Sequence, residues 1–125
     1  MVTLAYDDLL PLKYAARSYD LQSGALDCYG ATAEIVARAH GEAARSAFLA
    51  LIEKPTHNWE EVGDAVEPGD VVVSLAGNDL HVSGVAATTP ALVVSAARGF
   101  GVYAQRLSTV RDIVGIYRYP EAGCR

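Results

Sequence analysis

Apolar residues recur at helical spacing in two adjoining segments, 28–40 and 42–53. The stripe of the first consists of Cys28, Ala31, Thr32, Ile35, Val36 and Ala39. The stripe of the second consists of Ala44, Phe48, Leu51 and Ile52. Gly41 separates the segments and suits a helix C-terminus. Glu34 and Arg38 are spaced as an exposed helical pair, and His40 fits an exposed last turn. We therefore predict two amphipathic helices.

Helical spacing also occurs near the N-terminus. The positions concerned are Leu9, Leu12, Ala16 and Tyr19. Proline is tolerated in the first turn of a helix, so Pro11 is compatible with this spacing. The pattern predicts a further helix within residues 1–20.

Beyond residue 68, short apolar runs alternate with turn residues. The predicted strands are 70–76, 80–87, 91–97, 102–107 and 112–118. In the second of them, alternation places Val82 on one face and His81 on the other. We therefore predict one α+β domain over 1–125, with the helices first and the strands after them. The strands are expected to form an antiparallel sheet of about five, packed on the helix that begins at Cys28.

Composition narrows the classes of function. The chain has 125 residues, 51% hydrophobic residues and a net charge of −5, which indicate a single globular domain. Since no Lys/Arg cluster is present, nucleic acid is not expected as a partner. No apolar run is long enough to span a membrane, and no basic leader precedes one, so we expect neither a membrane span nor a signal peptide. The Cys and His spacings do not resemble a metal site, and no cofactor is expected.

The candidate chemistry centres on Asp27-Cys28-Tyr29-Gly30. Asp27 fits the N-cap of the helix that follows, which puts the Cys28 thiol at the positive end of the helix dipole. This dipole lowers a thiol pKa by about one unit or less, because it contributes only about 0.3–1 kcal/mol. A cysteine nucleophile therefore needs a second cation, usually an imidazolium.

Three histidines could supply that cation. His40 is expected at a helix end, and His57 in a solvated loop beside Trp59, which is expected to pack. His81 lies on a predicted strand that follows Pro68-Gly69-Asp70 and its strand. His81 is therefore the expected partner of Cys28.

The order of these motifs resembles the NlpC/P60 cysteine peptidases. In that family a DC[SWY]G helix start is followed by PGD, a strand and an HVGIY-like strand with the catalytic His. This chain has DCYG at 27–30, PGD at 68–70 and HVSGV at 81–85, and the similarity extends over roughly 12–120. The ending IVGIYR at 113–118 and the aromatic Tyr29 are similar to the subgroup found in phage tail-assembly regions.

The resemblance implies a papain-like fold and a thiol hydrolase that cuts amide bonds in the peptide stem of peptidoglycan. Cys28 would attack the carbonyl, and His81 would hold the thiolate and protonate the leaving amine. The backbone N–H of Cys28 is a candidate oxyanion donor. Asp27, Tyr14 and Tyr29 are the implied substrate contacts, although Tyr14 and Tyr19 suit the core equally well.

One position departs from the family. A third polar residue, His, Asn or Gln, normally orients the catalytic His, and here the matching position is Ser95. A hydroxyl can accept the imidazole N–H but reaches less far than an amide. Ser95 could support a weak enzyme, a backbone carbonyl could replace it, or the fold could survive without activity.

The alternatives are therefore an inactive structural module of a phage tail, or another thiol amidase or acyltransferase of this fold. Many enzymes of the latter kind place His before Cys, unlike this chain. The resemblance implies synthesis in a bacterial cytoplasm, with the phage virion and other tail proteins as candidate destination and partners. Cys28 and Cys124 are expected to stay unpaired, since Cys124 is one residue from the end.

Overall fold

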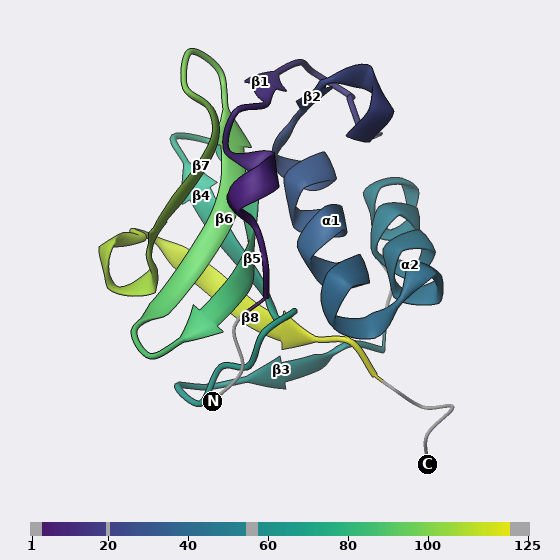
Figure 1. Cartoon of the computed structure of the whole chain (residues 1–125). Helices are drawn as coiled ribbons and strands as arrows, with labels where there is room; N and C mark the ends of the chain where they lie inside the picture. The colour runs from purple at the N-terminus through teal and green to yellow at the C-terminus, as the bar shows by residue number, and fades with distance from the viewer. Residues whose placement is uncertain (1–3, 20, 55–57, 121–125) are drawn as a thin grey trace.

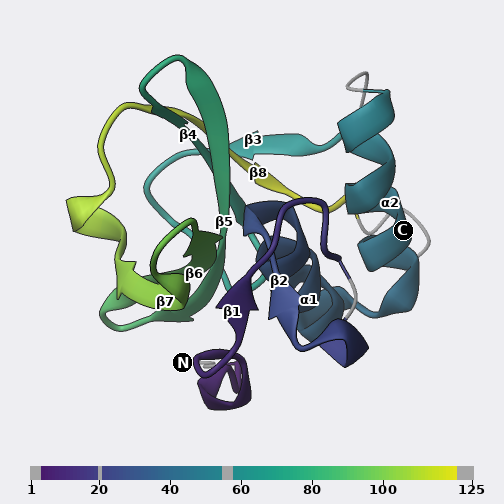
Figure 2. The ribbon, with the colours of Figure 1, turned by 90° about the horizontal axis from the view of Figure 1, so that it is seen from above.

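The computed structural model describes residues 4–19, 21–54 and 58–120. Within them, two helices lie along one face of a six-stranded sheet (Figures 1 and 2). The helices are α1 (Cys28–His40) and α2 (Glu42–Glu53). The strands of the sheet are β3 (Glu60–Val62), β4 (Val71–Ala76), β5 (Asp79–Thr88), β6 (Ala91–Ala97), β7 (Gly101–Arg106) and β8 (Ile113–Arg118). The α+β prediction is confirmed.

The strand order is β3-β8-β4-β5-β6-β7, and every neighbouring pair is antiparallel. The predicted count of about five strands missed β3. Its sequence, Glu60-Glu61-Val62, has no apolar alternation, and it becomes a strand only by pairing with β8. A strand of three residues with two exposed carboxylates carries too little local signal to be predicted.

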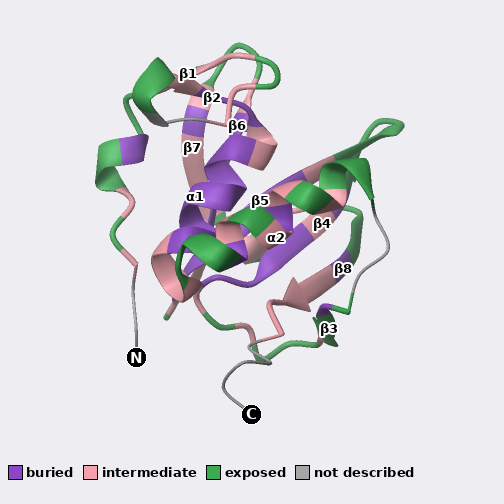
Figure 3. Ribbon diagram, turned by 90° about the vertical axis from the view of Figure 1, so that its right-hand side faces the viewer, coloured by how far each residue is buried: buried purple, intermediate pink, exposed green. Residues whose placement is uncertain are grey.

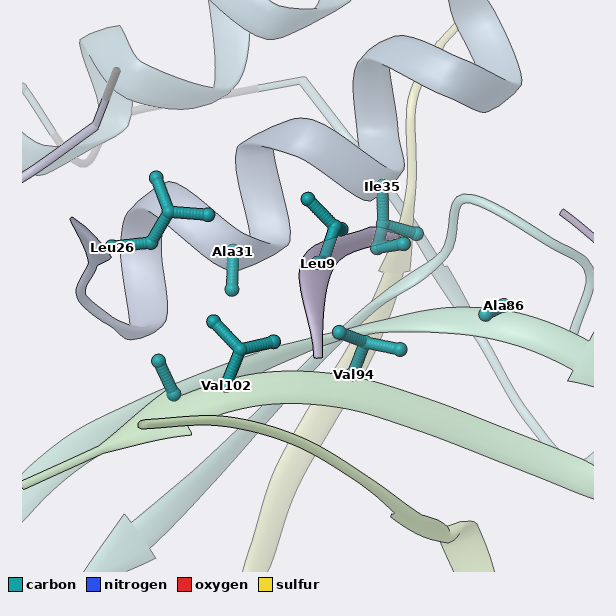
Figure 4. Packing of buried hydrophobic residues seen from close by; sticks show 8 residues of the cluster. Leu9, Leu26, Ala31, Ile35, Ala86, Val94 and Val102 are labelled. Atoms are coloured by element: carbon teal, nitrogen blue, oxygen red, sulfur yellow. The ribbon is translucent and has the colours of Figure 1, made fainter. Parts of the chain in front are cut away.

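The helix α1 forms the centre of the core. Its residues from Gly30 to Ala37 are all buried, whereas α2 buries only Ala44 and Phe48 (Figure 3). Figure 4 shows Ala31 and Ile35 of α1 above Val94 and Val102 of the sheet. Their burial contributes in proportion to the apolar area removed from water, about 25 cal/mol per Å². This packing fixes where the start of α1 meets the sheet.

The predicted helix within 1–20 is wrong. The segment instead contains a 3₁₀ helix (Asp7–Leu9) and strand β1 (Lys13–Tyr14), which pairs in parallel with β2 (Ala25–Leu26). The carbonyl of Leu12 accepts a hydrogen bond from the Val102 N–H of β7. The main-chain groups near Pro11 therefore bond to distant strands, and these tertiary partners override the local helical spacing.

The predicted exposed pair Glu34–Arg38 is also wrong. Glu34 is 5% exposed and accepts hydrogen bonds from Arg38 (3.3 Å) and from Arg45 of α2 (2.7 Å). Arg38 extends to Asp8 at 2.7 Å, so these charges link the N-terminal segment to α1 and α2. The spacing of Glu34 and Arg38 predicted their contact correctly, but α2 covers the carboxylate.

His40 was expected on the surface and is partly buried. Its ring lies 5.5 Å from that of Tyr119, centroid to centroid. Trp59 packs as expected, with its ring 6.2 Å from that of Phe48. His57 and Cys124 lie outside the described residues.

Candidate functional site

The helix α1 begins as its sequence predicts. Asp27 is the N-cap, and its Oδ1 accepts the Gly30 N–H at 2.7 Å. Its Oδ2 accepts the Arg17 N–H at 3.0 Å, so both oxygens bind main chain. A Cβ at position 30 would overlap the carbonyl oxygen of Ser18, which explains the glycine of the DCYG motif. Asp27 thus fixes the helix start, and its expected contact with a substrate amine remains a prediction.

Cys28 occupies the first position of α1 and is partly buried. Burial raises the pKa of its thiol, and the main-chain N–H of Val82 lowers that pKa only in part, while the charge of Asp27 raises it. The helix dipole was expected to favour the thiolate. Desolvation disfavours the charged form and outweighs it here, so the resting thiol is protonated near neutral pH.

His81 lies on β5 and is held by two hydroxyl groups. Its Nε2 is 3.1 Å from Ser95 Oγ on β6 and 2.9 Å from the Tyr103 hydroxyl on β7. The rings of His81 and Tyr103 are nearly parallel, at 4°. Burial lowers the pKa of His81, so the ring is neutral near pH 7. The predicted contact between Ser95 and His81 is therefore formed.

The protons of this cluster restrict the histidine tautomer. Ser95 Oγ–H donates to the Val82 carbonyl at 2.6 Å, which leaves only oxygen lone pairs for Nε2. The Ser95 contact therefore requires a proton on Nε2, and the Tyr103 hydroxyl oxygen can accept the same proton. The Nε2–H tautomer thus satisfies both contacts and leaves Nδ1 basic.

The Cys28 thiol and the His81 side chain lie towards opposite faces of β5. Val82 packs with Ala33 and Val36 of α1 in a cluster that Cys28 also contacts. Because successive side chains of a strand alternate, His81 leaves β5 on the opposite face. Among the described residues, no hydrogen bond or ion pair joins Cys28 to His81. Burial raises the pKa of Tyr103, and the charge of a Cys28 thiolate raises it further. The thiol therefore lies within electrostatic range of the Tyr103 hydroxyl.

The two tyrosines expected at the substrate lie apart. Tyr29, in the first turn of α1, lines an apolar cavity of about 380 Å³ together with Phe48. Burial raises the pKa of its hydroxyl. Tyr14 on β1 lies under the Arg98 guanidinium, 6.0 Å from the ring centroid, and packs against the cluster of Leu9 and Val102. The two side chains therefore line different surfaces.

Sequence reasoning missed Tyr103. It pairs directly with Ser95 across β6 and β7, in the register Ser95 to Tyr103. Strand alternation places both on the face of His81. The signal for Tyr103 was therefore a cross-strand register, which the sequence alone does not provide.

Other site types receive no support in the described part of the chain. Its His, Cys, Asp and Glu side chains form no group of three that could hold a metal ion. No helix there is long and apolar enough to cross a bilayer.

Comparisons with known proteins define the fold class. No family model and no curated protein matches the chain. Among solved structures, NlpC2 from Trichomonas vaginalis is similar with a TM-score of 0.62 and 17% identity, and the match covers 90% of this chain. NlpC1 from the same organism is similar with a TM-score of 0.63, 18% identity and 90% coverage.

The chain thus has an NlpC-like fold. It spans 43% of NlpC2 and 40% of NlpC1, less than half of each. At this level of identity the likeness shows the fold alone.

Proposed function

We propose that this chain is an NlpC-like module with little or no thiol hydrolase activity, which acts by binding or assembly. One observation carries the proposal. The Cys28 thiol lies against the Val82 main chain with a raised pKa, while the His81 imidazole is engaged by Ser95 and Tyr103. Among the described residues no hydrogen bond joins this thiol to an imidazole, and a protonated thiol is a weak nucleophile at neutral pH.

The setting proposed for this module is a phage tail. The support is the IVGIYR ending and the aromatic Tyr29, which are similar to the tail-associated subgroup. The partners would be other tail proteins or the peptide stem of peptidoglycan. The two Trichomonas proteins are more than twice as long as this chain, so such a fold occurs as part of larger proteins.

Hydrolysis of amide bonds in the peptidoglycan stem is the second candidate. It is favoured by the Ser95–His81 contact, which keeps Nδ1 basic in one tautomer. In that reaction Nδ1 takes the Cys28 proton, Sγ attacks the amide carbon, and the imidazolium returns the proton to the leaving amine. Water then cleaves the thioester, with His81 as base.

Thiol alkylation distinguishes the two candidates. The experiment uses a Cys124→Ser variant, so that iodoacetamide reacts with Cys28 alone. Its alkylation rate is compared with that of the same variant carrying His81→Ala. If the module is inactive, the alkylation rate rises only as the pH passes the pKa of an ordinary thiol, about 8.5 or above. His81→Ala then leaves the rate unchanged. For the hydrolase, Cys28 reacts near about pH 6 and His81→Ala slows it.

Mass analysis of peptidoglycan fragments provides the second test. Wild type, Ser95→Asn and Cys28→Ala are compared, because asparagine reaches further than serine and could restore orientation of His81. We expect all three to leave the fragments uncut. If wild type cuts the fragments and Cys28→Ala does not, the proposal of an inactive module is refuted and the hydrolase is established.

A further inference from the structure

The apolar cavity beside the start of α1 has a closed floor and an open rim. Its floor includes Phe48, Trp59, Val71 and Val82, all buried. Its rim includes Ile52 of α2, 36% exposed, and Leu80 of β5, 55% exposed. The entrance therefore lies between the end of α2 and the β4–β5 hairpin.

The size of the cavity limits what can enter. At about 380 Å³ it falls within the range of small-molecule sites, about 300–1,000 Å³. One turn of helix with its side chains, about 10–12 Å wide and 5.4 Å long, occupies roughly 420–610 Å³ and does not fit. A dry cavity of about 150 Å³ already holds benzene. The occupant is therefore a small molecule or a single chain of apolar atoms.

The chemistry of the walls limits the occupant further. None of the lining residues is charged, so the cavity offers no counter-ion to a buried charge. Beyond the rim, Leu75 pairs with Leu80 across the hairpin and is 42% exposed, which extends the apolar surface outward in one direction. The net charge of −5 on the whole chain gives an anionic amphiphile no long-range attraction.

We propose that this cavity binds the alkyl chain of a small amphiphile whose headgroup is uncharged and remains in solvent. The chain lies between α2 and the sheet, with its end at Trp59 and its outer part along Leu80 and Leu75. Binding requires no reaction at Cys28, so it is independent of whether the thiol is active.

Calorimetric titration with alkyl glucosides tests this proposal, using hexyl, octyl and decyl chains below their micelle concentrations. Each methylene buried in the cavity should tighten binding about fourfold, until the cavity is full. Val73→Phe fills the cavity from the sheet side and should weaken binding of the octyl compound by roughly tenfold or more. Ile52→Trp narrows the rim and is the second blocking variant.

The matched control is Val114→Phe, the same substitution at an exposed position outside the cavity. It should bind like wild type. Equal binding by wild type and by either folded blocking variant would overturn the proposal, as would the absence of any dependence on chain length. Sedimentation provides a further check. If wild type forms a dimer that Val73→Phe dissociates, and no glucoside binds, the cavity is occupied by a second copy of this chain and the proposal is overturned.

Discussion

At the scale of single residues, His81 shows how partners decide chemistry. The same imidazole has two hydroxyls at Nε2 and no bond to the thiol that the motif order suggested. Its protonation and its tautomer are therefore controlled by Ser95, Tyr103 and burial. Both properties can be measured.

The tautomer should follow the hydroxyl that remains. Tyr103→Phe leaves Ser95 at Nε2 and should keep the proton on Nε2, where Ser95 accepts it. Ser95→Ala should place the proton on Nδ1, because Tyr103 then donates to Nε2. Nitrogen chemical shifts of the His81 ring report the tautomer. The same tautomer in both variants would contradict this assignment.

The pKa of His81 predicts a pH dependence of stability. Burial lowers this pKa in the folded state, so below about 6.5 the unfolded chain binds a proton that the folded chain does not. The contribution of His81 is therefore complete above about 6.5 and is lost as the pH falls towards the folded pKa. Urea unfolding at about pH 5 and about pH 7.5 should show a smaller loss for His81→Gln than for wild type. Equal losses would mean that His81 does not titrate between the two states.

At the scale of elements, α1 and β5 are in contact through a glycine. A Cβ at Gly84 would lie 2.8 Å from Cβ and Cγ2 of Ile35, closer than carbon atoms pack. This close approach sets the distance between the helix and the sheet. The side chain missing from Gly84 is what lets α1 lie close to the sheet.

Gly84→Ala should therefore destabilise the fold by about 1–3 kcal/mol, the usual cost of overpacking. Ile35→Ala removes Cγ1 and Cγ2, two of the three Ile35 atoms that the new methyl group would meet, and should recover part of that loss in the double variant. Gly63→Ala is the control, because a Cβ there meets nothing within 4 Å. Chemical denaturation is measured for wild type and the four variants. An additive double variant would show that Ile35 is not what the new methyl group meets.

At the scale of the whole molecule, a buried ion pair joins distant parts of the chain. Asp70 is fully buried before β4, and Arg118 at the end of β8 binds both of its oxygens at 2.9 Å. The Glu67 N–H donates to the same carboxylate at 2.8 Å. The aspartate of the PGD motif thus holds the approach to β4 against the last strand.

Arg118→Met should cost roughly 3 kcal/mol of unfolding free energy, because it leaves a buried carboxylate without its cation. The same change in an Asp70→Asn background should cost much less, since no buried charge is then stranded. Urea unfolding of the four proteins gives the coupling between the two residues. Equal costs in both backgrounds would show that the pair contributes little to stability.

Elements whose signals are local could be predicted from the amino-acid sequence. The Asp27 cap, the helical spacing of 28–40 and 42–53, and the turn residues between strands specified both helices and five strands, because these signals act over a few residues. Asp27, Cys28 and the Ser95–His81 contact were also within reach, through motif order.

Other features of the fold depend on contacts between residues that are distant in the chain, and only the tertiary structure shows them. The 1–20 segment became strand and 3₁₀ helix because β2 and β7 bind its main chain, and β3 formed on β8. Glu34 became buried because α2 crosses it. The position of His81 on the face of Ser95 and Tyr103 followed from strand alternation and register, which are set by packing and cross-strand pairing over the whole sheet.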